Sequence, residues 1–280
     1  MKISVVITTY NRPDYLALSL KSVLAQNVPA YEIIVVDDNS SADYSEILTE
    51  LEGAQVRYIK LKQSSGANVA RNTGVEASTG DVVAFLDDDD IWLNDYLKYH
   101  YDAYSASADA VVSGFKHLGN EEQVRVNSDQ YVTKESLLKG NKYCGMSGFS
   151  CKRQILVKNP FDTSLNNGQD WDMFVRIFIQ NFRFTNIPLP IFLYRFQSID
   201  GIGAKLRKMK PSDIEKRLGS ARKHKVFLGE YWFKQRVAEQ LLGSLKYKNR
   251  KISWVVKSIE MVGVKATLIF FVRAVKKKFY

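Results

Sequence analysis

The sequence predicts an α/β fold: a mostly parallel sheet flanked by helices, followed by a basic helical extension. Three observations support this prediction. Apolar, β-branched runs alternate with segments of helical periodicity in the N-terminal part of the chain. Several of these runs end in polar clusters, and the positive charge is concentrated near the C-terminus. A chain of 280 residues can form one large domain, or one domain with an appendage.

The first apolar run, Ile3–Thr8, is continuous, which is typical of a parallel strand covered on both faces. A helix is expected next, with Asn11 as its N-cap, Pro13 in its first turn and Asp14 complementing its dipole. Apolar side chains then recur at helical spacing. These are Leu16, Leu20, Val23 and Leu24.

Three further strands are predicted in the N-terminal half, and one helix lies between the last two. The strands are Ile33–Val36, Val56–Leu61 and Val82–Leu86. The helix is Gly66–Ala77, which contains Arg71. This βαβα order indicates a parallel sheet with right-handed crossovers.

The second half of the chain is less regular, and its predicted elements are shorter. We expect a strand, a short helix, a loop that leads to a strand, a helix and a final strand-like segment. In order, these are Ala110–Phe115, Lys134–Lys139, residues 140–153, Met173–Ile179 and Arg183–Tyr194.

Three predicted strands end in polar clusters, at Thr8–Asn11, Asp37–Asn39 and Asp87–Asp90. In parallel sheets, ligands bind beyond the carboxyl ends of the strands. Because these clusters share that position, they predict a cleft large enough for a nucleotide at one rim of the sheet.

The cluster Asp87–Asp90 places four carboxylates directly after a strand that has the character of a buried one. Adjacent buried carboxylates repel one another and are costly to desolvate unless a cation compensates them. Mg²⁺ and Mn²⁺ favour such ligands and commonly share them with a phosphate-bearing substrate. The pattern therefore favours a metal-assisted phosphate or diphosphate site. The alternative is an acidic surface loop that caps a helix at Leu93–Ser105.

Taken together, the motifs resemble those of glycosyltransferase family 2, the inverting enzymes of GT-A fold. The resemblance covers roughly residues 1–200 and rests on motifs that occur in the family's order. They are Ser4–Asn11, Val35–Ser40, Ala70–Gly74, Phe85–Asp90 and Gly168–Asp172. The last of these is similar to the family's "ED" motif, although Gln169 stands where Glu is usual.

This resemblance implies a division of the chain into three parts. Residues 1–105 would form the nucleotide-sugar-binding half of a GT-A domain, residues 106–200 its acceptor half, and residues 201–280 the helical extension. Within the first half, Thr8 and Tyr10 would hold the uracil of the donor, with Tyr10 as an aromatic wall.

The resemblance also assigns roles to several charged side chains. Asp38 would accept the hydrogen bond of uracil N3–H, and Arg71 would neutralise charge near the nucleotide. The DxD motif is Asp87-Asp88-Asp89, in which Asp89 is the expected ligand of Mn²⁺ or Mg²⁺. Asp87 is a second candidate ligand, and Asp87 and Asp88 would face the metal or the ribose.

Two other aspartates are expected to have structural roles. Asp37 would form hydrogen bonds within its loop, and Asp90 would cap the helix that follows. At the position where many relatives carry a His, this chain has Gln197, a weaker neutral ligand.

Asp170 is the expected general base, which would remove the proton of the acceptor hydroxyl as it attacks the anomeric carbon. Direct attack from the face opposite the diphosphate inverts that centre without an enzyme nucleophile. The alternative role for Asp170 is a helix cap. Trp171 could form a platform for the acceptor sugar or belong to the core, and the sequence leaves both open.

The resemblance implies transfer from a UDP-sugar to a glycan, such as a lipid-linked glycan in bacterial O-antigen, capsule or exopolysaccharide synthesis. This activity would be cytoplasmic, at the inner face of the plasma membrane. Two alternatives are a sugar-nucleotide nucleotidyltransferase, which would release pyrophosphate, and a non-catalytic module that binds nucleotide-sugars. Cys144 and Cys151 lack metal-site spacing and suit a reducing compartment.

The charge distribution separates the extension from the rest of the chain. Residues 202–280 carry 21 Lys/Arg against 5 Asp/Glu, whereas residues 1–201 carry 19 against 25. Basic residues mixed with Trp, Phe and aliphatic side chains indicate helices that lie on an anionic membrane surface. The alternative is a helical hairpin that packs on the catalytic domain or forms a dimer interface. Nucleic acid is not an expected partner, because the segment contains no recognised nucleic-acid-binding module.

Overall fold

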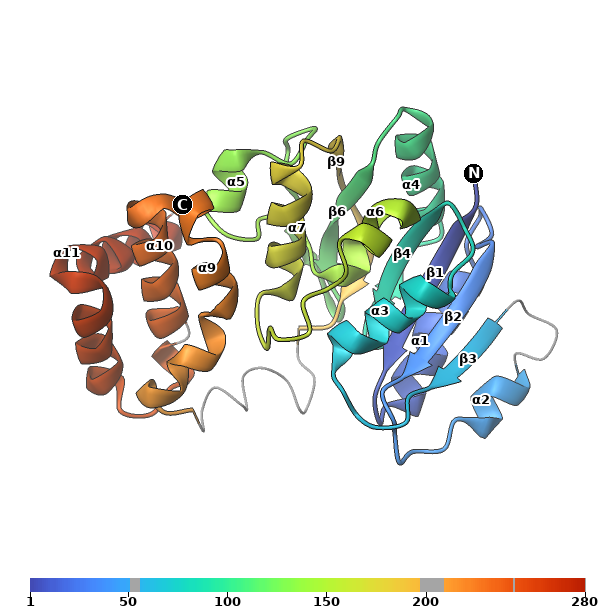
Figure 1. Ribbon diagram of the computed structural model, residues 1–280, viewed down its shortest axis with the longest axis horizontal. Coiled ribbons are helices and arrows are strands. Elements are labelled where there is room, and N and C mark those ends of the chain that lie inside the picture. Colours follow the sequence, from blue (N-terminus) through green and yellow to red (C-terminus); the bar gives the residue numbers. More distant parts are fainter. Residues whose placement is uncertain (51–55, 197–208, 244, 280) are drawn as a thin grey trace. The chain divides into compact units, whose positions relative to one another are not determined.

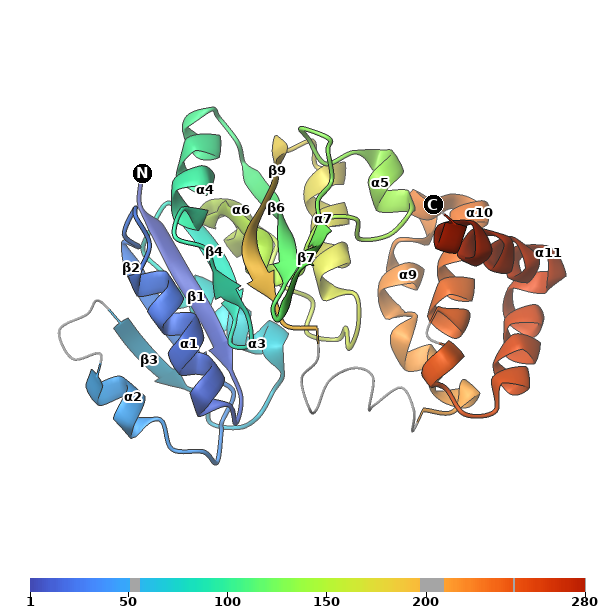
Figure 2. The same ribbon diagram turned by 180° about the vertical axis from the view of Figure 1, so that it is seen from behind.

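The computed structural model describes residues 1–50, 56–196, 209–243 and 245–279, without the side chains of residues 50 and 276–279. Its described strands form one mixed sheet in the order β3-β2-β1-β4-β8-β6-β9-β5, and β7 pairs with β6. Strands β1, β2, β3, β4, β6 and β9 are labelled in Figure 1, and β7 is labelled in Figure 2. The strands are β1 Ile3–Thr9, β2 Glu32–Asp37, β3 Val56–Lys60, β4 Val82–Asp87, β5 Ile91–Trp92, β6 Ala110–His117, β7 Asn120–Arg125, β8 Phe149–Lys152 and β9 Phe184–Tyr194.

The four predicted N-terminal strands are confirmed and run parallel as β3, β2, β1 and β4. Every residue of β1 is buried, as its continuous apolar run predicted. The pairing places Thr8 beside both Val36 and Asp87, and Thr9 beside Asp37. The polar clusters therefore meet at one rim of the sheet.

Helices cover both faces of this sheet. Helices α3 and α6 lie on the face seen in Figure 1, and α1 and α4 lie on the face seen in Figure 2. Gly74 of α3 packs so closely on β1 that a Cβ atom there would overlap the Val6 methyl groups. The helices are α1 Pro13–Leu24, α2 Ser45–Glu50, α3 Ala67–Ala77, α4 Tyr96–Ser105 and α6 Arg153–Lys158.

The prediction that Asn11 caps α1 is wrong. The N-cap position belongs to Arg12 and makes no side-chain capping hydrogen bond, whereas Pro13 and Asp14 lie in the first turn as expected. Asn11 instead has a positive φ of 54°, and its Oδ1 accepts hydrogen bonds from the backbone amides of Ser41 and Ala42. The strand-end loop therefore uses Asn11 to hold the loop after β2.

The later predicted strands are also present as β6, β8 and β9. Strand β8 is antiparallel to β4 and β6, whereas β9 is parallel to β6. The sequence did not predict β5, which has two residues, or β7, whose residues are all exposed and mostly polar. Neither strand has the alternating or continuous apolar pattern that marks a strand in a sequence.

The structure divides into two compact units. The first contains Met1–Lys134, Asn141–Thr163 and Met173–Phe196, and the second contains Glu135–Gly140, Ser164–Asp172 and Gln197–Tyr280. The first turn of α7, which spans Gln169–Ile179, therefore belongs to the second unit together with the C-terminal helices.

The second unit has a hydrophobic core of its own. Its elements include α5 Lys134–Leu138, η2 Pro211–Arg217, α9 Gly219–Lys223, α10 Lys225–Leu242, η3 Leu245–Tyr247 and α11 Lys251–Phe279. Helices α10 and α11 pack against each other around Leu241 and the fully buried Trp254. The described helices α10 and α11 thus pack on each other as a hairpin. A kink at Gly263, with a φ of 84°, divides α11.

Candidate active site

Asp88 lies at the centre of the polar rim, just beyond β4. Its Oδ2 accepts a hydrogen bond of 2.8 Å from Thr9 Oγ1, and its Oδ1 lies 3.3 Å from Arg12 Nη1. Burial, together with repulsion from Asp89 and Asp87, raises the pKa of Asp88 to about 6 despite the opposing effects of Thr9 and Arg12. The carboxylate is therefore short of positive compensation.

Asp89 lies beside Asp88 and shares its cation. Arg12 Nη1 lies 3.1 Å from Asp89 Oδ2. Burial and repulsion from Asp87 raise the pKa of Asp89, against the attraction of Arg12 and Arg195. Two neighbouring carboxylates thus have pKa values above the ordinary range even though guanidinium groups are close.

Asp87, the first residue of the DxD motif, pairs with Arg71. Arg71 Nη2 lies 2.6 Å from Asp87 Oδ1, and its Nη1 donates a 3.4 Å hydrogen bond to Asn68 Oδ1. Arg71 is buried, and its Nε has no hydrogen-bond partner in the part of the chain that the structure describes. The structure therefore brings the predicted Arg71 into the acidic cluster.

The prediction that Asp90 caps the following helix is wrong. Helix α4 begins at Tyr96 with Asp95 at its N-cap position. Asp90 is instead 2% exposed, and it accepts hydrogen bonds of 2.6 Å from Ser147 Oγ and 2.8 Å from the backbone amide of Arg195. Burial and the two nearby carboxylates raise its pKa well above the ordinary value. Asp90 therefore ties the motif to the segments at Ser147 and after β9.

The loop after β2 uses its two aspartates differently. Asp37 is fully buried and accepts hydrogen bonds from the amide and hydroxyl of Ser40 and from Tyr58 Oη. This arrangement agrees with the structural role expected of Asp37. Asp38 accepts hydrogen bonds from Ser64 Oγ at 2.9 Å, the Ser65 amide at 2.7 Å and the Gly66 amide at 2.9 Å.

These three bonds leave room for one more at Asp38, because an ionised carboxylate offers about four acceptor positions. Among the other predicted donor-binding residues, Thr8 is buried within β1, whereas Tyr10, on the loop that follows β1, is 49% exposed. The structure thus brings together Thr8, Tyr10, Asp38, Arg71 and Asp87–Asp89 within the first unit.

Asp170 lies in the second unit, in the first turn of α7. Its Oδ1 accepts a 2.7 Å hydrogen bond from the Trp171 amide. Trp171 is 1% exposed, and its Nε1 donates to the Leu137 carbonyl at 2.8 Å. Of the two readings left open, Trp171 therefore belongs to the core and does not form an acceptor platform. Gln197 lies outside the described residues.

Two arginines at this site were not identified as functional residues from the sequence. Arg12 follows the first polar cluster and pairs with Asp88 and Asp89. Arg195 follows β9, and its Nε donates a 3.0 Å hydrogen bond to the Asp89 carbonyl. Arg12 could have been identified from the sequence, because it is a cationic residue directly after a strand-end polar cluster. No local pattern connects Arg195 with a motif 106 residues earlier.

The acidic cluster suits a metal ion that the substrate also binds. Within the described ranges, no three His, Cys, Asp or Glu side chains are arranged to hold a metal by themselves. Mg²⁺ and Mn²⁺ are commonly held by one or two carboxylates together with substrate phosphates, so a three-residue set is not required. The raised pKa values of Asp88 and Asp89 show carboxylates that an additional cation would stabilise. The donor set therefore fits a shared divalent cation.

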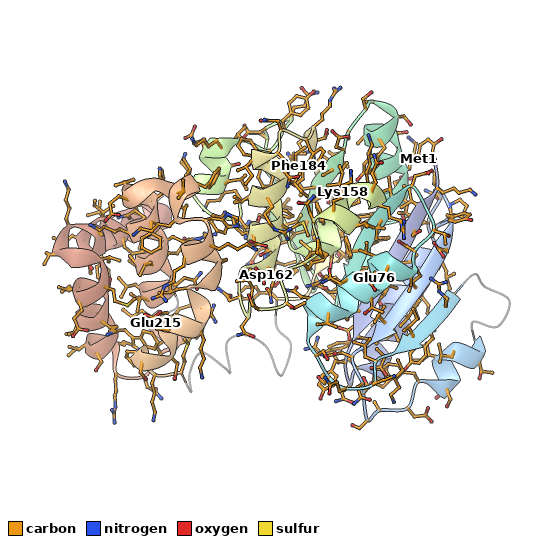
Figure 3. The ribbon with its side chains drawn as sticks, viewed as in Figure 1. Met1, Glu76, Lys158, Asp162, Phe184 and Glu215 are labelled. Atoms are coloured by element: carbon orange, nitrogen blue, oxygen red, sulfur yellow. The ribbon has the colours of Figure 1, made fainter. Side chains whose placement is uncertain are left out.

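The described side chains also connect the face of the sheet that carries α3 to the loop before α7. The Asn68 amide donates a 2.7 Å hydrogen bond to the carbonyl of Asp162, which is labelled in Figure 3. Asn72 likewise exchanges hydrogen bonds with the backbone of Phe161. The helix that carries Arg71 is thus fixed to the segment at residues 161–162.

The family model described as "Glycosyl transferase family 2" matches residues 4–166, more than half of the chain. The chain belongs to glycosyl transferase family 2. Its acidic cluster and strand-end loops all lie within the matched range.

Comparison with curated proteins gives relatives of varied coverage. An uncharacterised glycosyltransferase of Bacillus subtilis, YwdF, is 31% identical over 226 residues, which are 74% of this chain and 81% of that protein. The Escherichia coli "UDP-Glc:alpha-D-GlcNAc-diphosphoundecaprenol beta-1,3-glucosyltransferase WfgD" is 25% identical over 181 residues, 64% of this chain and 70% of that protein. An uncharacterised glycosyltransferase of Nostoc sp. is 35% identical over 172 residues. That match covers 56% of this chain but only 53% of the Nostoc protein.

Solved structures confirm the GT-A fold. Staphylococcus aureus TarS in complex with UDP-GlcNAc has a TM-score of 0.64 at 18% identity, covering 93% of this chain and 71% of that chain. The Pyrobaculum calidifontis mannosyltransferase PcManGT in complex with GDP-Man and Mn²⁺ also has a TM-score of 0.64, at 17% identity. That match covers 100% of this chain and 81% of PcManGT.

Proposed function

We propose that this chain transfers a sugar from a UDP-sugar to an acceptor hydroxyl with inversion at the anomeric carbon. The observation that carries the proposal is the buried acidic cluster at the carboxyl ends of β1, β2 and β4. Asp88 and Asp89 keep raised pKa values there although Arg12 is within 3.3 Å. Such a rim suits a diphosphate with its counter-cation.

The base-binding end of the donor site would consist of Thr8, Tyr10 and Asp38. Three donors orient the Asp38 carboxylate and leave it one acceptor position, which would receive the N3–H of uracil. The exposed ring of Tyr10 is available to stack on the base. Cytosine and adenine lack a ring N–H at the corresponding position, so this contact favours uracil over them.

The diphosphate end would be held by the DxD motif and its arginines. Asp89, with Asp87 as a second ligand, would hold Mn²⁺ or Mg²⁺, and such an ion acts as a Lewis acid toward a diphosphate leaving group. Asp88, anchored by Thr9, would face the ribose or the metal. The Arg71 guanidinium would neutralise charge beside Asp87. A relative in fold binds GDP-Man together with Mn²⁺, which supports a divalent cation in this family of sites.

The acceptor end would depend on Asp170, whose carboxylate would take the proton of the attacking hydroxyl. Asp170 lies in the first turn of α7, next to the positive end of the helix dipole. The acceptor oxygen would form its bond to the anomeric carbon as the bond from that carbon to the diphosphate oxygen breaks. UDP would then leave, and the proton taken up by Asp170 would pass to solvent.

A lipid-linked glycan on the cytoplasmic leaflet is the proposed acceptor class. Two E. coli relatives are named for glucosyl transfer to GlcNAc-diphosphoundecaprenol, and a B. subtilis relative is named for teichuronic acid biosynthesis. The extension at residues 202–280 carries an excess of 16 positive charges, which suits an anionic membrane surface.

Exposed apolar side chains on α11 support this membrane contact. They form one stripe before the kink at Gly263 and one after it, and each is between 40% and 80% exposed. The stripes are Ile252, Val256 and Ile259, and Val264, Leu268, Val272 and Val275. No helix among the described residues combines the length and the apolar character needed to cross a membrane. The two exposed stripes and the basic charge support our proposal that the chain lies on the membrane surface.

Vesicle flotation tests the membrane proposal. Leu268→Asp with Val272→Asp should abolish co-flotation with vesicles rich in phosphatidylglycerol, because charged side chains cannot enter the acyl region. Val226→Asp is the matched control, since Val226 is 98% exposed on α10 and outside both stripes. Equal flotation of the double variant and the control would contradict the proposal.

Nucleotide release tests the transferase proposal. Wild type should release UDP from one or more UDP-sugars with Mn²⁺ or Mg²⁺ and a lipid-linked acceptor. EDTA or Asp89→Ala should suppress this release. Asp102→Ala is the control, because Asp102 is exposed on α4 and pairs only with Lys98 among the described ion pairs. Release of GDP from GDP-mannose instead would refute the uracil assignment, and release of pyrophosphate would indicate a nucleotidyltransferase.

A further inference from the structure

The motif that carries Asp170 is anchored by the C-terminal helices and not by the sheet. Both residues that follow Asp170 are buried, and the side chains that hold them come from the α9–α10 region. His224, at the junction of α9 and α10, contacts Asp172, and Arg236, on α10, contacts Trp171. All of these residues belong to the second unit.

The first anchor is a buried hydrogen-bonded pair. His224 Nε2 lies 2.7 Å from Asp172 Oδ1, and both side chains are at most 7% exposed. Because a carboxylate only accepts, Nε2 must carry the hydrogen. Lys223 Nζ lies 2.9 Å from the same oxygen. Asp172 is thus a buried carboxyl group that two side chains from the end of α9 contact.

The second anchor is a cation–π contact. The Arg236 guanidinium carbon lies 4.4 Å from the centre of the Trp171 ring, and the Trp171 Nε1–H is used by the Leu137 carbonyl. Arg236 is largely buried, and its Nη1 lies 3.5 Å from Glu239. Burial lowers the pKa of Arg236, while Glu239 and Asp170 act against that effect. The guanidinium therefore lies within the electrostatic reach of the proposed base.

The backbone before Asp170 is also fitted to these helices. Gly168 has a φ of +70°, and a Cβ there would lie 2.6 Å from Ser220 Oγ. Arg217 Nη2 donates a 3.2 Å hydrogen bond to Asn167 Oδ1. Gly140, with a φ of +111°, leaves the space that the Arg236 guanidinium occupies. The motif is thus held on both sides of Asp170.

We propose that His224 and Arg236 are positioning residues for Asp170, so that the C-terminal helices form part of the acceptor-activating machinery. The inference rests on the proposed function in that it assumes Asp170 to be the base. The packed helices would then serve catalysis directly, in addition to any contact with a membrane. An error of about 1 Å in the placement of a catalytic group can cost about 100-fold in rate.

The test compares His224→Ala and Arg236→Ala with three reference proteins. His224→Gln keeps an N–H donor at the end of the side chain, and Arg236→Lys keeps a cation that can face Trp171. Arg222→Ala is the matched control, because Arg222 is exposed on α9 and pairs with Glu215. Each protein is assayed for kcat, for the KM and Kd of the UDP-sugar, and for hydrogen exchange of the peptide spanning residues 168–176.

The expected result is a split between turnover and donor binding. The two Ala variants should lose about 10- to 100-fold in kcat, with KM and Kd for the donor near wild type. Their Asp172 amide, which donates to the Gly168 carbonyl in wild type, should exchange faster. His224→Gln and Arg236→Lys should recover most of both losses, and Arg222→Ala should behave as wild type.

Two results would overturn the inference. The first is unchanged kcat and exchange in both folded Ala variants. The second is an equal loss of donor binding and turnover, which would mean general destabilisation. Failure of the proposed function looks different: wild type would release no nucleotide from any nucleotide-sugar, while the exchange data would still decide whether these residues hold the motif.

Discussion

His100 provides a quantitative test of the packing behind the acidic rim. The side chain is fully buried on α4, its ring stacks on Tyr96 at 4.1 Å, and Nδ1 lies 2.7 Å from Ser150 Oγ. Its Nε2 has no hydrogen-bond partner among the described residues. Burial lowers the pKa of His100 from 6.5 to about 3. The folded protein therefore keeps this ring neutral at any pH near neutrality.

The sign of the resulting pH dependence follows from linkage. Below pH 6.5 the unfolded chain protonates this His, whereas the folded chain does not until about pH 3. The free energy of unfolding therefore falls as the pH drops through this window. At pH 5, which is 1.5 units below the pKa of 6.5 in the unfolded chain, protonation stabilises the unfolded state. At about 1.4 kcal/mol per unit, this amounts to roughly 2 kcal/mol.

His100→Phe removes this titration and keeps an aromatic ring that can stack on Tyr96. Ser150 Oγ would still pair with Tyr104 Oη, which lies 2.8 Å away. Urea denaturation at pH 7.5 and pH 5 should show that the variant loses about 2 kcal/mol less than wild type between the two conditions. Tyr104→Phe is the control, because it alters the same hydrogen-bond network without removing a His. If His100→Phe lost as much stability as wild type, the buried neutral state of His100 would be refuted.

Three further predictions concern the helices and the proposed base. Gly74→Ala should lower the free energy of unfolding by about 2 kcal/mol through overlap with Val6, as measured by thermal denaturation. Gly145→Ala is the control, because a Cβ there would meet no atom within 4 Å. Burial lowers the pKa of Lys248 to about 8, so the free energy of unfolding should rise as the pH rises from 8 to 10.5. Lys248→Met should remove that rise, as measured by urea denaturation. Asp170→Asn should abolish transfer while calorimetry still detects binding of the UDP-sugar, and a variant that kept most of its activity would exclude Asp170 as the base.

The parallel half of the sheet could be predicted because its strands carry their own signal. The apolar run of β1 and its buried neighbours require cover on both faces, and the polar residues that follow must then meet at one rim. Family motifs added the roles of Asp38, Asp89 and Asp170, which remain proposals.

Other parts of the site depend on contacts between distant segments, which periodicity does not reveal. A helix follows Asp90 in the sequence, which predicts a helix cap, but its carboxylate accepts hydrogen bonds from Ser147 and Arg195. Asn11 likewise serves the loop at Ser41 and not its own helix. The anchoring of Asp172 by His224 joins residues 52 positions apart, so only the folded chain shows it.

The measurement that tests the central claim most directly is the anomeric configuration of the product. Wild type would be incubated with an α-linked UDP-sugar, Mn²⁺ and a lipid-linked GlcNAc acceptor, and the new linkage would be read by NMR from its anomeric coupling constant. Direct attack assisted by Asp170 predicts a β-linked product, absent with Asp170→Asn. An α-linked product would contradict inversion, and with it the assignment of Asp170 as the base in a single displacement.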